Sequence, residues 1–196
     1  MKSIKENVTN EIIIKKSKFI TKLYKVYNLE EIENILFELK KEYKDATHIC
    51  YAYILNNIKR FNDDNEPSKT AGIPILKVLE NNELDNVLCV VIRYFGGIKL
   101  GASGLIRAYC NCTCEALNKT SIIELVPAKI IELSFCYDKL KKIDSIVKDL
   151  SIIEKKFNQI IIYTIVIKND EFNSLKNSLN NLYQSLEIKQ DTFTEI

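Results

Sequence analysis

Two apolar patterns with different periods occupy the first quarter of the chain. Residues 11–27 interleave β-branched and apolar residues with lysines, which is typical of one or two β-strands. The next segment, 28–43, repeats its apolar residues at helical spacing. Asn28 can cap this helix, with Glu31 three residues later as its capping-box partner.

The middle of the chain predicts two more strands and two more helices. Continuous apolar runs over 46–55 and 86–95 favour buried strands. Between them, 56–72 is polar and predicts a loop, after which Pro74 suits the first turn of a short helix. A further helix is expected over 102–118. Its apolar side is formed by Leu105, Tyr109, Cys112 and Ala116.

Pro127 marks the expected end of a first domain. After it the patterns predict a strand, a helix, two strands with a short turn near Asn158, a helix and a last strand. This β-α-β-β-α-β order is the ferredoxin-like plan. The sequence therefore predicts an α+β protein with two domains, residues 1–126 and 127–196.

The composition is that of an ordinary globular protein, with 46% hydrophobic and 28% charged residues. No apolar run approaches the roughly 18 residues of a membrane span, so no membrane partner is expected. The first residues lack the features of a signal peptide, which predicts a cytoplasmic protein whose six cysteines are reduced. The net charge of +2 neither demands nor excludes a nucleic-acid partner.

Arginine and glycine are concentrated in one short segment. Residues 93–109 read RYFGGIKLGASGLIRAY and hold four of the five glycines and two of the three arginines. Arginine presents a planar fork that lysine cannot copy, so its retention in a lysine-rich chain suggests that this geometry is needed. A strand, a glycine-rich turn and a helix N-terminus in succession are typical of phosphate binding.

Known nucleotide loops do not fit this segment. Ala102 stands where a Walker A loop requires lysine, and the GxGxxG spacing of a dinucleotide site is absent. What remains is a helix N-terminus with nearby cations, and a polar helix face carrying Ser103 and Asn111, which could hold polynucleotide phosphates. The residues expected to bind a nucleic acid or another anion are Arg60, Lys69, Arg93, Gly96, Gly97, Lys99, Gly101, Ser103 and Arg107.

A purely structural alternative is equally open. In it the glycines only make a tight turn, and Arg93 and Arg107 pair with acids of the loop at 63–68. That loop is itself a second candidate site, since three close carboxylates could hold Mg²⁺ or act as general acid and base. Acids just ahead of a helix also compensate its dipole. The three carboxylates are those of Asp63, Asp64 and Glu66.

Histidine and cysteine do not make a convincing site. His48 is the only histidine, and it shares a strand face with Cys50, whereas tetrahedral zinc takes four ligands. Cys110, Cys112 and Cys114 follow one another at every second helical position, so Cys112 points away from the other two. Packed thiols are the favoured interpretation, and no metal or other cofactor is expected.

Three runs in the same order and spacing resemble the IMPACT/YigZ family. They are ATHICYAYIL, DDNEPSKTAGIPILKVLE and NVLCVVIRYFGGIKLGASGLIRAY, and KKSKF near the N-terminus also matches. The resemblance is strong over roughly residues 10–118. This chain departs from the family's DDGEPSGTAG loop at Asn65 and Lys69, which replace two glycines. Asn65 tolerates a positive φ, whereas Lys69 implies either an ordinary φ or a new cation beside the acids.

The resemblance implies a first domain like domain IV of elongation factor G and a second like its domain V, both of which work against ribosomal RNA. It marks a family-motif surface formed by His48, Asp64, Glu66, Pro67, Ser68, Thr70, Ala71, Gly72, Tyr94 and Phe95. Bacterial members have been labelled proline dipeptidases, but a single histidine gives a two-metal peptidase no support here.

The favoured function is a non-catalytic, translation-associated regulator, monomeric or weakly dimeric, that binds RNA or the ribosome through the glycine- and arginine-rich surface. One alternative is a protein-binding regulator of a stress or translation pathway. The other is a metal-dependent hydrolase that uses the Asp63, Asp64 and Glu66 loop, so enzymatic activity is left open.

Overall fold

A computed structural model describes residues 1–195 of the chain. The chain divides into two compact units, Met1–Glu124 and Leu125 onward. The strand β7 (Ile122–Phe135) begins in the first unit and continues into the second, so Pro127 lies inside a strand and two residues beyond the start of the second unit.

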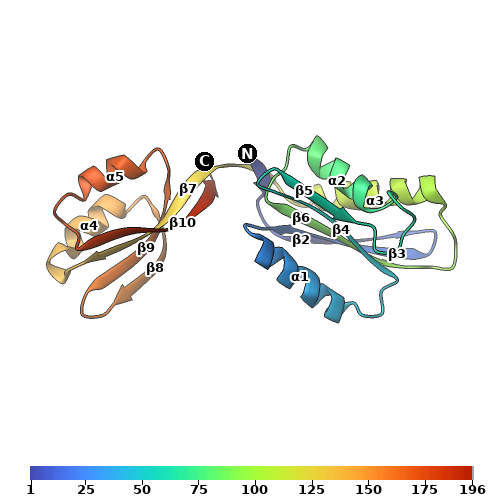
Figure 1. The fold of residues 1–196 in the computed structure, drawn as a ribbon, viewed down its shortest axis with the longest axis horizontal. Coiled ribbons are helices and arrows are strands. Elements are labelled where there is room, and N and C mark those ends of the chain that lie inside the picture. The colour runs from blue at the N-terminus through green and yellow to red at the C-terminus, as the bar shows by residue number, and fades with distance from the viewer. Residues whose placement is uncertain (196) are drawn as a thin grey trace. The chain divides into compact units, whose positions relative to one another are not determined.

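The first unit contains an antiparallel sheet in the order β2-β3-β6-β4-β5 (Figure 1). Its strands are β2 (Val8–Ile14), β3 (Ser17–Lys25), β4 (His48–Leu55), β5 (Ile58–Asn62) and β6 (Val87–Tyr94). A short strand, β1 (Lys2–Ile4), pairs with the beginning of β7. The expected loop at 56–72 is wrong in part because β5 lies within it; every residue of this edge strand is exposed, so no buried apolar face signals it.

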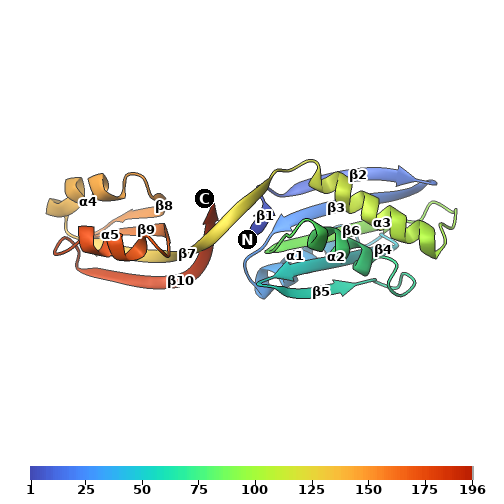
Figure 2. The same ribbon diagram turned by 90° about the horizontal axis from the view of Figure 1, so that it is seen from above.

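Helices cover both faces of this sheet. The helix α1 (Leu29–Glu42) packs on one face, and α2 (Gly72–Asn81) and α3 (Ala102–Leu117) lie side by side on the other (Figures 1 and 2). The central strand β6 is buried on both faces, which explains its unbroken apolar run. The cap predicted for α1 is present, since Asn28 Oδ1 accepts from Glu31 N at 2.8 Å; the Glu31 carboxylate accepts from Tyr27 N rather than from Asn28 N.

The second unit has the predicted order β-α-β-β-α-β. After β7 come a short 3₁₀ turn (Tyr137–Lys139), α4 (Leu140–Val147), β8 (Ser151–Phe157), β9 (Ile161–Lys168), α5 (Phe172–Ser178) and β10 (Ser185–Glu195). The strands pair antiparallel in the order β10-β7-β9-β8, and the two helices pack on one face of them. Across residues 1–195, no helix has both the length and the apolarity that a membrane crossing requires.

Candidate anion-binding site

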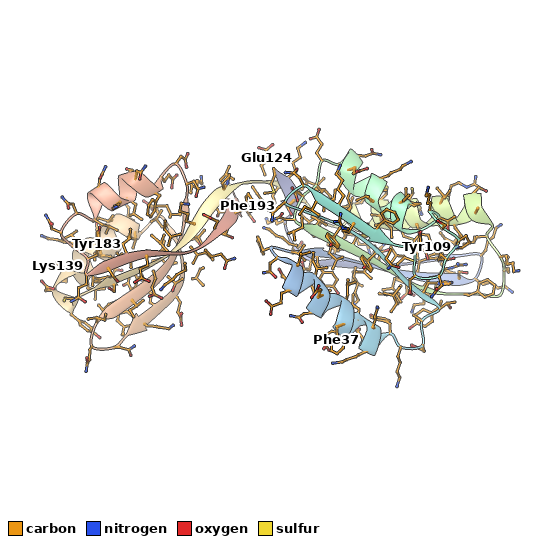
Figure 3. All side chains as sticks on the ribbon, viewed as in Figure 1. Phe37, Tyr109, Glu124, Lys139, Tyr183 and Phe193 are labelled. Carbon is orange, nitrogen blue, oxygen red and sulfur yellow. The ribbon has the colours of Figure 1, made fainter. Side chains whose placement is uncertain are left out.

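An ion pair lies at the end of β6, beneath the glycine-rich turn. Arg93 Nη1 donates to Glu66 Oε1 at 2.5 Å, and the two side chains are 5% and 3% exposed. The Tyr109 hydroxyl, between α3 and the sheet (Figure 3), donates to the same oxygen at 2.8 Å. The expectation that Arg93 is an open phosphate ligand is therefore wrong, because its guanidinium is buried against an acid. The structural alternative is correct for this arginine.

His48 and Cys50 continue this network on β4. His48 Nδ1 lies 2.8 Å from the Asp64 carbonyl oxygen, which can only accept, so this nitrogen carries a proton. The Cys50 thiol donates to the Asp63 carbonyl oxygen at 3.0 Å, and burial raises its pKa to about 12. A buried neutral thiol is neither a nucleophile nor a metal ligand.

The carboxylates of the acidic loop serve the backbone. Asp63 accepts from the N–H groups of Lys69, Ala71 and Gly72, and Asp64 Oδ2 accepts from Ile49 N at 2.6 Å. Within the described residues, no group of three or more His, Cys, Asp or Glu side chains is arranged to hold a metal. These carboxylates are therefore occupied by backbone N–H groups, by Arg93 and by Tyr109.

Left-handed backbone is kept where the family has glycines. Asn65 has φ +64° and Lys69 has φ +66°, so the first interpretation of Lys69, an ordinary φ, is wrong. Thr70 closes the loop by donating its hydroxyl to the Pro67 carbonyl oxygen at 2.6 Å. Gly72 is required because a Cβ there would lie 2.9 Å from the Phe61 ring.

The glycine-rich turn is packed against the β2–β3 hairpin. A Cβ at Gly96 would lie 2.0 Å from the backbone of Lys16, and Gly96 N donates to Ser17 Oγ at 3.2 Å. Lys15 and Lys16 form the two-residue hairpin loop, both with positive φ. The contact between the glycine-rich turn and this hairpin therefore places the two lysines near α3.

The N-terminus of α3 is open. Gly101 precedes the helix with φ +72°, no side chain caps it, and its first turn carries no acid. Leu105 N is the first to bond back within this turn, to Gly101 O at 2.9 Å, which leaves the N–H groups of the three preceding helical residues without an intrahelical acceptor. As predicted, Ser103, Arg107 and Asn111 are exposed on one face, opposite the buried apolar side.

Two cavities flank this helix end. We call the first the β6–α3 cavity; it has a volume of about 410 Å³. It is lined by Thr47, His48, Glu66, Pro67, Arg93, Phe95, Lys99, Leu100, Gly101, Ala102 and Leu105. The second, the hairpin cavity, measures about 420 Å³. It is lined by Ile14, Lys15, Leu100, Gly104, Arg107, Ala108 and Asn111.

The candidate residues divide among these places. The β6–α3 cavity brings Lys99 and Gly101 together with several family-motif residues, and Arg107 lines the hairpin cavity. Arg60 lies on the edge strand β5, and neither it nor Lys69 or Ser68 lines either cavity. Tyr94 lines neither cavity, and its hydroxyl donates to Asp45 Oδ1. Lys15 and Lys16 were missed, although the KKSKF run held their signal.

Comparison with known proteins identifies relatives of this chain. A family model described as the Impact N-terminal domain matches residues 15–117. "IMPACT family member YvyE" of Bacillus subtilis is 40% identical over 159 residues, which are 80% of this chain and 73% of that protein. "IMPACT family member YigZ" of Escherichia coli is 33% identical over 138 residues, 68% of each chain. The crystal structure of a hypothetical protein matches with a TM-score of 0.66 and 27% identity over 95% of both chains. The resemblance found in the sequence is confirmed.

Proposed function

We propose, since this chain belongs to the IMPACT family, that it is a non-catalytic, translation-associated regulator that binds RNA through the surface around the N-terminus of α3. The observation that carries this proposal is the open helix end itself. Three backbone N–H groups and the positive end of the helix dipole meet at Ala102–Gly104, where neither a cap nor an acid neutralises them.

Free cations surround this helix end. Lys15, Lys16, Lys99 and Arg107 are exposed, and none of them forms a salt bridge within residues 1–195. Lys99 lies on the cavity at the mouth of α3, and Arg107 lies one helical turn further along, on the face that Ser103 begins. Cations and backbone N–H groups in this arrangement contact phosphates without reading sequence.

Binding without catalysis fits the chemistry of the nearby side chains. The carboxylates of the acidic loop accept hydrogen bonds from backbone N–H groups, from Arg93 or from Tyr109. The neighbouring Cys50 is a neutral thiol, because burial holds its pKa far above 7. These hydrogen bonds connect the loop ahead of α2 with β4, β6 and α3.

The fold gives the proposal a second support. We infer that the second unit is a ferredoxin-like domain, since its strands follow the order β10-β7-β9-β8 with both helices on one face. The family resemblance implies that the first unit is similar to domain IV of elongation factor G and the second to its domain V. A pair of such domains fits a protein that works beside ribosomal RNA.

Fluorescence anisotropy with a labelled RNA of about 12 nucleotides tests the proposal, since single-strand sites cover about 4–16 nucleotides. If about three phosphates are neutralised, raising KCl from about 50 to 200 mM weakens binding roughly 20-fold, because the salt slope is about 0.7 per phosphate on single strands. The double variant Lys99→Gln/Arg107→Gln should bind more weakly and with a shallower salt slope.

The matched control removes the same charge elsewhere. Lys40 and Lys44 are exposed in or just after α1, on the opposite side of the sheet, so Lys40→Gln/Lys44→Gln should bind like the wild type. Absence of RNA binding by the wild type at low salt would refute the proposal. Capture of a protein from nuclease-treated extract by the same surface would then favour the protein-binding alternative.

A further inference from the structure

We propose that the RNA is single-stranded at this site and that the β6–α3 cavity takes one unpaired nucleotide, with its base stacked on Phe95 and its phosphate at the N-terminus of α3. The inference rests on the proposed function and specifies its ligand. It is carried by the way polar groups are distributed between the floor and the rim of the cavity.

The floor of the cavity presents an unused acceptor. Glu66 is 7% exposed and lines the cavity, and both hydrogen bonds that it accepts, from Arg93 and from Tyr109, go to Oε1. Its other oxygen, Oε2, accepts no hydrogen bond from any described residue and lies 3.8 Å from His48 Nε2.

The Glu66 carboxylate on the cavity wall selects what can enter. It accepts N–H groups, which every nucleobase carries on its Watson–Crick edge, and it repels phosphate. Because Glu66 lines the cavity and its Oε2 accepts no hydrogen bond from the described residues, a ligand with an N–H donor can bind at this oxygen. The floor therefore suits a base.

The rim of the cavity has the opposite character. Gly101, the residue before α3, and Ala102, its first residue, line the cavity there together with Lys99. The free N–H groups of the first helical turn and the Lys99 ammonium attract an anion. A ligand with N–H donors at one end and a phosphate at the other matches both the floor and the rim, and a nucleotide is such a ligand.

Phe95 provides a stacking surface in the wall of the cavity. Its side chain is 45% exposed and lines the cavity, while its backbone N–H is held by Thr47 Oγ1 at 2.9 Å. The Arg93 guanidinium lies 5.6 Å from the ring centroid and supports one side of the ring. Bases stack on such aromatic rings in single-strand binding proteins, whichever base is present.

The neighbouring hairpin cavity lies where the RNA strand would continue beyond the β6–α3 cavity. Leu100 lines both cavities, so they meet at this side chain, and Lys15 and Arg107 lie on the far side of it. The next phosphate along the strand can reach these two cations. An RNA duplex cannot use this path, because its bases are paired inside the helix and unavailable to a stacking ring.

Anisotropy titrations at low salt test the inference with one RNA sequence in two forms, free and annealed to its complement. The wild type should bind the free strand at least tenfold more tightly. Phe95→Leu should lose most of that preference, whereas Phe95→Tyr, which keeps an aromatic face, should retain it. Phe37→Leu is the matched control, because Phe37 is 59% exposed on α1 (Figure 3) and should have no effect.

The outcomes separate the two proposals. Equal affinity of the wild type for strand and duplex, or an unchanged strand preference in Phe95→Leu, would overturn the single-nucleotide inference while salt-dependent RNA binding still stood. No binding of either form would overturn both. Thermal unfolding of each variant by circular dichroism verifies that a change in affinity does not reflect unfolding.

Discussion

Arg93 and Glu66 form a largely buried ion pair in the wall of the β6–α3 cavity, the proposed site for RNA. They come from distant parts of the chain, the end of β6 and the loop ahead of α2, and Tyr109 from α3 contacts the same carboxylate. Three elements of the first unit are thereby fixed at one point. The pair supports the site from below and leaves the binding of phosphate to the backbone and cations above it.

Breaking this pair should destabilise the first unit severely. Arg93→Ala leaves a buried carboxylate without its cation, a change that costs about 3–5 kcal/mol. The free energy of unfolding, measured with urea, checks this. Arg93→Met/Glu66→Gln removes both charges and should be less destabilising than Arg93→Ala; a single variant as stable as the wild type would contradict the buried pair.

Two adjacent glycines should respond differently to alanine. A Cβ at Gly96 would meet the Lys16 backbone at 2.0 Å, whereas one at Gly97 would meet nothing within 4 Å and would suffer only from a φ of +83°. Gly97→Ala is expected to cost about 1–2 kcal/mol, and Gly96→Ala more, because the hairpin must move. Urea unfolding gives the loss of stability of each variant. Equal losses would argue against the close contact between Gly96 and the hairpin.

The buried thiols should resist alkylation. Burial raises the pKa of Cys50, Cys89 and Cys112 to about 12, so almost no thiolate is present near pH 8. Mass spectrometry after iodoacetamide treatment should show these three unmodified in the folded protein, while the exposed Cys114 and Cys136 react.

The same thiols give a pH dependence of known sign. Their pKa is higher in the folded chain than the ordinary value of 9.0, so their stabilising contribution is complete below about pH 9. It is lost as the pH rises from there toward about 12. The free energy of unfolding should therefore fall over this range, and a Cys89→Ala variant should show a shallower fall than the wild type.

A carboxylate at the start of α3 should separate folding from binding. Ala102→Glu places an acid in the uncapped first turn, which stabilises the helix by about 0.3–1 kcal/mol through the dipole. The same charge repels phosphate, so RNA affinity should fall at least tenfold. Ala102→Gln is the neutral control and should bind nearly as well as the wild type; equal binding by both variants would remove α3 from the site.

Local periodicity predicted most elements of the fold, because helix caps and apolar repeats are encoded by neighbouring residues. The cap at Asn28, the buried side of α3 and the β-α-β-β-α-β order were all readable in this way. The edge strand β5 was not, since an exposed strand buries no alternating face.

The site was only partly predictable for a different reason. The exposed helix face that carries Ser103 and Arg107 follows from helical spacing. The burial of Arg93, in contrast, depends on Glu66, 27 positions earlier, and on Tyr109. The left-handed φ of Lys69 likewise depends on Asp63, which accepts its N–H. Partners that are distant in sequence leave no periodic signal.

The most direct test of the central claim is an NMR titration of the ¹⁵N-labelled protein with a short single-stranded RNA. The largest chemical-shift changes are expected for the Ala102, Ser103 and Gly104 amides, followed by residues around Lys99 and Arg107. Changes confined to β5, α1 or the second unit, with these three amides unmoved at saturation, would contradict that claim.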